Sequence, residues 1–136
     1  MKFNSLIPEL SVTDIQKSKQ FYIQVLGFVL EYERPQDKFV FVSYCGSQIM
    51  LEQINDNWNT GKLEYPLGRG INFQIETTEV EQIQNRLIQN NVPIYKQIFE
   101  SIYQVKNKTY AEKELLVQDP DGYLLRFSQT TTQAKK

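Results

Sequence analysis

Hydrophobic and polar residues alternate along the start of the chain and then change to a helical spacing. Residues 5–12 (SLIPELSV) have the short, bounded apolar pattern of a strand. Apolar positions then recur at helical spacing, which predicts a helix at 14–26. Thr13 and Gln16 fit a capping box at its start, and Gly27 supplies a left-handed stop. The first elements are therefore expected to be a strand and a helix.

Three strand-like runs follow this helix, and the same order of elements then repeats. The first three runs cover residues 28–33, 38–45 and 47–54, and a polar linker covers 55–68. Thr78 and Glu81 fit a second capping box. The second set is expected to contain a strand at 70–77, a helix ending at Asn90 and Asn91, and strands within 92–100, 100–118 and 123–129. The turn Asp119-Pro120-Asp121-Gly122 opens the last strand.

This repetition predicts a fold class. Two tandem βαβββ modules, residues 1–54 and 69–130, are joined by the linker at 55–68. The second module carries an insertion near residues 106–109. Strands and helices alternate too rarely for a doubly wound sheet, so the pattern favours an α+β fold with curved, mostly antiparallel sheets around a groove. With 136 residues, the chain is expected to be a single domain.

Composition excludes several classes of function. The chain has no histidine, which removes the usual general base near neutral pH and the commonest transition-metal ligand. The net charge is −1 without a basic run, so nucleic-acid binding is not expected. No apolar run is long enough for a membrane span and no signal peptide is apparent, so the protein is expected to be cytoplasmic. Cys45 falls in an expected strand and is interpreted as a buried structural thiol.

Three separated motifs, in order, carry a family resemblance. They are PELSVTDIQKSKQFYIQVLGF, the strand IMLEQ and the ending DPDGYLLRF. Together they resemble the vicinal oxygen chelate superfamily, which includes glyoxalase I, extradiol dioxygenases, and fosfomycin and bleomycin resistance proteins. The resemblance runs from about residue 5 to 129 and implies the fold described above.

The metal-binding positions of that superfamily are poorly filled in this chain. By motif alignment they correspond to Ile7, Glu52, Gly70 and Arg126. Only Glu52 can bind a cation, and a guanidinium repels one. The resemblance is closer to the metal-free bleomycin resistance branch, which shares Met50-Leu51-Glu52 and the DPDG ending. It implies no metal, no cofactor, and a homodimer whose N-terminal strands are exchanged. Pro8, just inside the first strand, suits such an exchange.

The same resemblance implies a groove that sequesters a planar hydrophobic ligand, such as an antibiotic of the bleomycin class, without altering it. Strand alternation places Leu124, Arg126 and Ser128 on one face, with Glu52 expected opposite as ligand contact or ion-pair partner. The candidate ligand-binding residues are Phe39, Phe41, Glu52, Trp58, Tyr65, Asn72, Gln74, Tyr103, Tyr110 and Arg126.

Two alternative functions remain open at the level of sequence. An enzyme on the same scaffold, glyoxalase-like or dioxygenase-like, would use Glu52 as base or a tyrosine as acid, with Arg126 stabilising developing charge. A structural or regulatory module with a closed groove is the other. One feature argues against a cationic drug, because Arg126 opposes the acidic cleft that would attract it.

Overall fold

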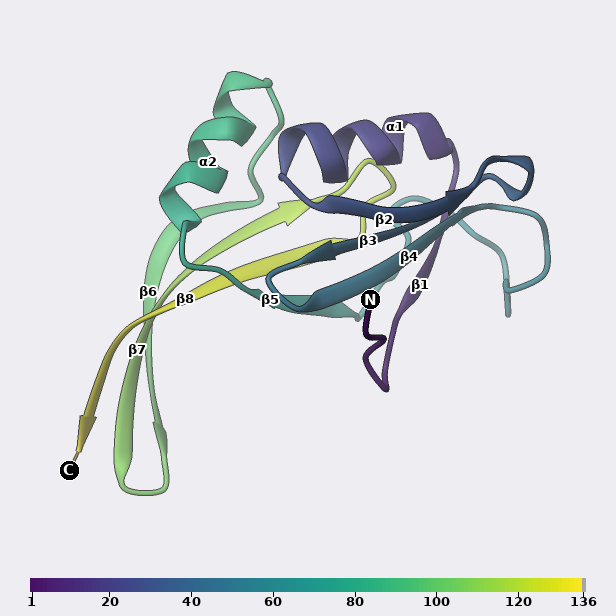
Figure 1. Cartoon of the computed structure of the whole chain (residues 1–136). Coiled ribbons are helices and arrows are strands. Elements are labelled where there is room, and N and C mark those ends of the chain that lie inside the picture. The colour runs from purple at the N-terminus through teal and green to yellow at the C-terminus, as the bar shows by residue number, and fades with distance from the viewer. Residues whose placement is uncertain (136) are drawn as a thin grey trace. The chain divides into compact units, whose positions relative to one another are not determined.

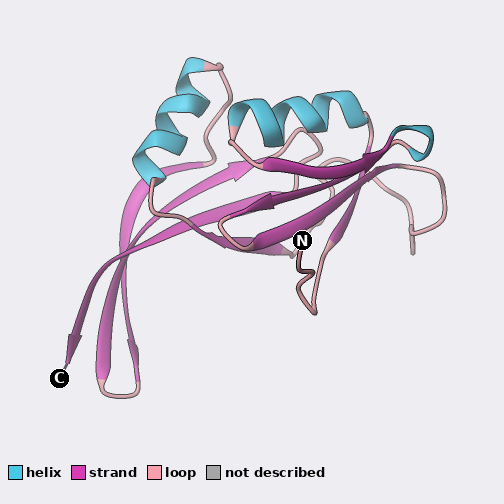
Figure 2. Ribbon diagram, in the orientation of Figure 1, coloured by secondary structure: helices cyan, strands magenta, loops and turns pink. Residues whose placement is uncertain are grey.

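The computed structural model describes residues 1–135, with the side chains of residues 1–131. The chain divides into two compact units, each built around one four-stranded sheet. The first unit contains residues 1–69 together with the turn at 119–122, and the second contains residues 70–118 and 123 onward. Each unit has the element order βαβββ, as the repeat in the sequence predicts (Figures 1 and 2). That the whole chain forms a single domain stays a prediction.

The first sheet has the strand order β1-β4-β3-β2. Its strands are β1 (Glu9–Val12), β2 (Val29–Arg34), β3 (Phe39–Tyr44) and β4 (Ser47–Gln53). Strand β1 runs parallel to β4, and the other pairs are antiparallel. One face buries Leu10, Val40 and Leu51, which neighbour one another across the sheet. Burial alternates along β1 and β4, as expected for strands with one face in the core, whereas β3 is buried on both faces.

The helix of the first unit changes from α-helix to π-helix along its length. Helix α1 (Ile15–Lys19) continues as a π-helix, η1 (Gln20–Val25), so the predicted helix is confirmed to within one residue at each end. The predicted capping box is wrong. Asp14 is the N-cap, and its Oδ1 accepts from the backbone N–H groups of Gln16 and Lys17 at 3.0 and 3.4 Å. A short 3-10 turn, η2 (Pro35–Asp37), joins β2 to β3.

The second sheet repeats this order as β5-β8-β7-β6. Its strands are β5 (Asn72–Glu76), β6 (Lys96–Val105), β7 (Lys108–Gln118) and β8 (Leu124–Lys135). Strand β5 runs parallel to β8, and β6 and β7 form a long antiparallel hairpin (Figure 1). The insertion expected near residues 106–109 is therefore the tip of this hairpin. The buried face carries Ile75, Leu115, Leu125 and Phe127.

Helix α2 (Val80–Gln89) buries Val80, Ile83 and Leu87, at the spacing of a single helix face. The capping box predicted for it is also wrong, because Glu79 is the N-cap and makes no side-chain cap bond. The first N–H of the helix is instead satisfied by a distant residue, since Val80 N donates to Gln129 Oε1 at 3.0 Å. The helix ends at Asn90, and Asn91 has a positive φ of 57°, as expected from the sequence.

The DPDG turn at residues 119–122 packs into the first unit. Gly122 N donates to the Asp119 carbonyl at 2.9 Å and has φ 94°. The Tyr22 hydroxyl donates a hydrogen bond to Asp119 Oδ2 at 2.7 Å, and the Thr13 hydroxyl donates one to Asp121 Oδ1 at 2.6 Å. Both carboxylates are buried. The turn therefore holds the start of the first helix, which explains why Thr13 does not cap it.

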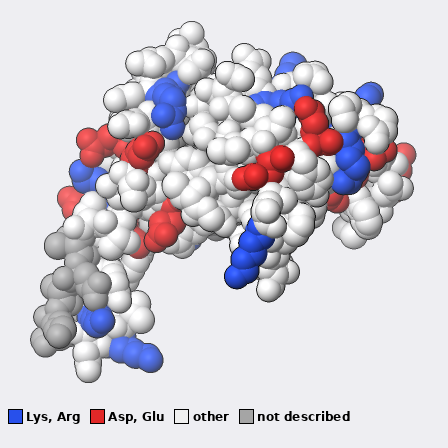
Figure 3. Space-filling view, viewed as in Figure 1, with Lys and Arg blue, Asp and Glu red and all other residues white. Residues whose placement is uncertain are grey.

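The surface carries charge of both signs. On the face drawn in Figure 3, acidic and basic side chains are interspersed. Within residues 1–135, no helix is long and apolar enough to cross a membrane. Cys45 is exposed in the tight turn between β3 and β4, with φ 47°, so its interpretation as a buried thiol is wrong. The turn takes Cys45 out of the ladder, because β3 ends at Tyr44.

Candidate functional site

The face of the second sheet opposite its buried core carries a connected group of polar side chains. Strand alternation places Leu125 and Phe127 in the core and turns Arg126 and Ser128 to the other face, as the sequence predicts. We call this group the Arg126 cluster. Its members are Asn72 and Gln74 on β5, Tyr103 on β6, Glu112 and Glu114 on β7, and Arg126, Ser128 and Thr130 on β8.

Arg126 is held by three acceptors. Its Nη1 donates to Glu114 Oε1 at 2.8 Å, its Nε to Asn72 Oδ1 at 3.1 Å and its Nη2 to Gln74 Oε1 at 3.2 Å. The Glu114 side chain is only 4% exposed, whereas that of Arg126 is 30% exposed. The planar guanidinium is suited to this geometry because its donors diverge in one plane. The hypothesis from the sequence placed the partner carboxylate at Glu52, but Arg126 takes it from Glu114 on the neighbouring strand.

A second carboxylate, Glu112, lies two residues earlier on the same strand face. It accepts hydrogen bonds from the Tyr103 hydroxyl at 2.5 Å, from the Thr130 hydroxyl at 3.2 Å and from the Ser128 hydroxyl. Burial acts to raise the pKa of Glu112, but these hydrogen bonds and the positive charge of Arg126 outweigh it, and the pKa is lowered. Glu112 is therefore a carboxylate in its ionised form.

Tyr103 is affected in the opposite direction. Its hydrogen bond to Glu112, followed by burial and by the negative charges of Glu114 and Glu112, raises the pKa of Tyr103 to about 12. The phenol therefore stays protonated and donates. With two carboxylates and one guanidinium, the Arg126 cluster has a formal charge of −1. Glu112 and Glu114, which the sequence interpretation did not name, therefore make the cluster acidic despite Arg126.

Sequence reasoning found half of this cluster. Asn72, Gln74, Tyr103 and Arg126 were candidates and are brought together. Tyr110, also a candidate, lies directly opposite Tyr103 in the register and is half-buried. Strand alternation placed Ser128 on this face without making it a candidate. The cluster members that sequence reasoning missed are Glu112, Glu114 and Thr130. The alternation of residues 110, 112 and 114 along the expected strand was the signal that would have found the two glutamates.

The face of the first sheet opposite its buried core is aromatic. Phe39 and Phe41 lie on it but are only 2% and 1% exposed, because other groups cover their rings. The Arg34 guanidinium lies 3.9 Å from the Phe39 ring centre. Tyr32 stacks on Phe41 with ring centres 5.1 Å apart and planes at 16°. We call Tyr32, Arg34, Phe39 and Phe41 the aromatic face.

Acidic groups border this aromatic face. Trp58 Nε1 donates to Glu52 Oε1 at 3.0 Å, and Trp58 is 64% exposed. Burial, followed by the negative charge of Glu52, raises the pKa of Glu9, and Arg34 opposes this effect. A hollow of about 550 Å³ lies beside Glu52. It is lined by Gln36, Asp37, Lys38, Glu52, Gln53, Ile54, Asn55 and Asn57. Glu52 and Trp58 therefore form a polar edge at which a ring is exposed.

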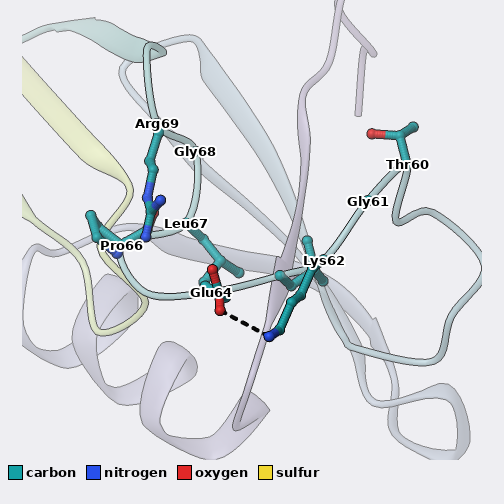
Figure 4. A pocket seen from close by; sticks show the side chains of 9 residues that line it. Thr60, Gly61, Lys62, Glu64, Pro66, Leu67, Gly68 and Arg69 are labelled. Atoms are coloured by element: carbon teal, nitrogen blue, oxygen red, sulfur yellow. Dashed lines mark hydrogen bonds and ion pairs between the residues drawn. The ribbon is translucent and has the colours of Figure 1, made fainter.

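The remaining candidate, Tyr65, belongs to the linker loop and is 62% exposed. Arg69 Nη2 donates to the Tyr65 carbonyl at 2.9 Å, and its Nε donates to the Pro66 carbonyl at 3.2 Å. The same loop surrounds a hollow of about 340 Å³, in which Lys62 pairs with Glu64 (Figure 4). The charged side chains Lys62, Glu64 and Arg69 all bind other groups of the same loop. We therefore interpret this hollow as part of the loop structure.

Comparison with known proteins decides the family. Residues 3–127 match the Glyoxalase/Bleomycin resistance protein/Dioxygenase superfamily. The chain belongs to this superfamily. It is 32% identical over 129 residues to the bleomycin resistance protein of Geobacillus stearothermophilus, and the match covers 90% of this chain and 94% of that protein. A bleomycin resistance protein of Staphylococcus aureus matches with the same values. The resemblance stated from the sequence is confirmed.

Solved structures with a similar fold confirm the fold class. A virulence protein from Salmonella typhimurium is similar with a TM-score of 0.68 and 22% identity, covering 96% of this chain and 100% of that one. TioX from Micromonospora sp. ML1 has a TM-score of 0.71 and 16% identity, covering 95% and 100%. At these identities the likeness concerns the fold alone. The α+β prediction of two βαβββ modules is confirmed.

The metal positions of the superfamily do not fit a divalent ion in this chain. Ile7 has no ligand atom in its side chain, and Gly70 has no side chain. Arg126 is a cation engaged by its own acceptors, and Glu52 is engaged by the Trp58 indole. Among residues 1–135, no group of three or more histidine, cysteine, aspartate or glutamate residues is arranged to hold a metal ion. One carboxylate is too few for a divalent site.

Proposed function

We propose that this chain is a metal-independent binding protein that sequesters a planar hydrophobic molecule carrying positive charge, of the bleomycin class, without modifying it. The proposal joins three supports: membership of the superfamily, 32% identity to bleomycin resistance proteins over nearly the whole chain, and the composition of the Arg126 cluster. The protein acts as a homodimer, in which the N-terminal strands can be exchanged between subunits, and the ligand occupies clefts shared between them.

The observation that carries the proposal is the state of the Arg126 cluster. A guanidinium with three acceptors occupies the position of a metal-ligand residue, and its neighbour Glu112 accepts three hydrogen bonds. A catalytic acid or base works best when its pKa lies near the working pH. Glu112 has a lowered pKa and Tyr103 has one of about 12, so both are far from neutral. The cluster is suited to holding a ligand and poorly suited to moving its protons.

The ligand class follows from charge and aromatic content. The Arg126 cluster has one excess negative charge. At the aromatic face, the two carboxylates Glu9 and Glu52 outnumber the single guanidinium of Arg34. Acidic surfaces concentrate cationic ligands and lose this advantage as salt rises. The exposed ring of Trp58 offers a stacking surface for a flat heteroaromatic group. A planar cation satisfies both features.

The proposal is tested by titrating metal-free bleomycin into the protein while following the fluorescence of Trp58, the single tryptophan of the chain. We expect saturable quenching that weakens with added salt, and recovery of chemically unchanged drug by mass spectrometry. Glu112→Gln should weaken binding by roughly threefold to tenfold, since a partly exposed charge contributes about 1 kcal/mol. Trp58→Phe is the control: it removes the signal, and calorimetry then measures binding directly.

A calorimetric titration that shows no binding at millimolar bleomycin would exclude this drug. Drug recovered in altered form would exclude sequestration and favour an enzyme. Stoichiometric nickel, zinc or manganese that raises the melting temperature would contradict metal independence, because a ligand that binds only the folded state stabilises it.

A further inference from the structure

The N-terminal residues that precede β1 lie against the aromatic face. The Phe3 ring meets the Phe41 ring edge-on, with ring centres 5.5 Å apart and planes at 86°. It meets the Tyr32 ring in the same way, at 6.5 Å and 85°. Edge-to-face geometry at these distances is the favoured contact between aromatic rings. Phe3 therefore occupies a position formed by the stacked pair Tyr32 and Phe41.

Phe3 differs from the other groups that cover this face. Tyr32 and Arg34 belong to β2 and are fixed by the ladder with β3. Phe3 lies before β1, whose pairing with β4 begins at Glu9, and the Pro8 carbonyl accepts the Met50 N–H at 2.9 Å. The Phe3 ring can therefore leave without breaking a strand pair of the sheet.

The attachment of this segment depends mainly on one side chain. Gln48 Oε1 accepts from Asn4 N at 2.7 Å, and Gln48 Nε2 donates to the Lys2 carbonyl at 2.7 Å. Asn4 Nδ2 also donates to the Gly46 carbonyl at 2.8 Å. All three bonds are exposed, and Phe3 is itself 54% exposed. Segments with few buried contacts and exposed hydrogen bonds open at low free-energy cost. We call residues 2–4 the N-terminal arm.

We propose that the position of the Phe3 ring is a subsite for an aromatic ring of a ligand, and that the N-terminal arm is its displaceable occupant. The inference deepens the proposed function and rests on it for the identity of the natural ligand. A site that accepts a phenyl ring edge-on against two rings accepts the edge or face of another flat arene. Only molecules in which Phe3 has left the subsite can bind such a ligand there. The apparent dissociation constant is therefore the intrinsic one divided by the fraction of molecules with an open subsite.

The test uses thioflavin T, a planar cationic benzothiazole dye whose fluorescence rises when it is immobilised. It is titrated into wild-type protein and into Phe3→Ala, with circular dichroism to check folding. We expect the dissociation constant to fall by roughly tenfold in Phe3→Ala, because the competing ring is gone. Gln48→Ala should give a smaller gain, since it removes two attachments of the arm but keeps the ring. Leu6→Ala is the matched control, because Leu6 lies between the N-terminal arm and β1, is 84% exposed and should leave the affinity unchanged.

The double variant Phe3→Ala/Tyr32→Leu locates the dye, because the gain should disappear when half of the stack is removed. A gain that persists in the double variant overturns the proposal. So does unchanged or weaker binding in Phe3→Ala, or dye binding by neither protein. Should Phe3→Ala fail to fold, Gln48→Ala decides by the same measure. Bleomycin is absent throughout, so this test and the test of sequestration fail independently.

Discussion

At the scale of single residues, Arg126 shows how a buried ion pair shapes a sheet face. Its guanidinium neutralises Glu114, which is nearly inaccessible, and orders two amides on β5. Burying such a pair costs desolvation free energy, so its presence is weak evidence for stability. Removing one partner, however, strongly destabilises the fold. The destabilisation arises because the remaining charge stays buried without a partner of opposite sign.

Arg126→Met is therefore expected to lower the free energy of unfolding by about 3 kcal/mol, near the lower end for buried pairs because Arg126 is partly exposed. Urea denaturation followed by circular dichroism measures the change. Replacing both partners, as Arg126→Met/Glu114→Met, should restore most of the stability, since no charge is then stranded. Lys113→Met is the control, because its pair with Glu81 is exposed and is expected to contribute at most about 1 kcal/mol. Equal losses in Arg126→Met and Lys113→Met would contradict the argument.

At the scale of elements, the sequence predicted the order of the strands and helices, although β1 begins only at Glu9 and β6 extends to Val105. It did not predict what satisfies the helix ends. Both capping boxes failed, and in each unit a glutamine on the last strand accepts a backbone N–H at the start of the helix that precedes it in the chain. Gln53 Oε1 accepts from Ile15 N at 3.1 Å, as Gln129 Oε1 accepts from Val80 N. These partners are 38 and 49 residues away from the groups they satisfy. Local capping rules cannot find them, because they arise only when the strand packs beneath the helix.

The DPDG turn leaves no room for a side chain at Gly122. A Cβ atom added at Gly122 would lie 2.5 Å from Pro66 Cβ and 2.6 Å from Pro66 Cα. Gly122→Ala should therefore incur both the left-handed backbone cost, about 1–2 kcal/mol, and overpacking of about 1–3 kcal/mol. Gly46→Ala is a matched control, since Gly46 has φ 89° but nothing within 4 Å of the added atom. Thermal or urea unfolding of the two variants measures the difference, and equal destabilisation would mean that the turn relaxes around Pro66.

At the scale of the whole molecule, duplication made the fold predictable. The repeated order of elements and the DPDG ending were readable in the sequence, and both four-stranded sheets follow from them. The contacts within the candidate site were harder to predict than the fold, because contacts between strands depend on their register. The register pairs Phe41 with Tyr32 and makes Glu114 a diagonal neighbour of Arg126, so neither contact follows from the local sequence. Phe3 was missed for a different reason: nothing in its local pattern indicates that it folds back onto a sheet.

The chain is expected to assemble as a dimer. Sequestration in clefts shared between subunits requires a dimer, so sedimentation velocity at micromolar protein should give twice the chain mass of 16.0 kDa. A Glu9→Cys/Met50→Cys pair in a Cys45→Ser background then locates β1, because Glu9 and Met50 are partners in the parallel register. A disulfide across neighbouring strands satisfies the distance that the bond requires. On a non-reducing gel, covalent dimers indicate exchanged strands and covalent monomers indicate strands kept in their own chain. A monomer in sedimentation would contradict the shared cleft, whichever chain β1 pairs with.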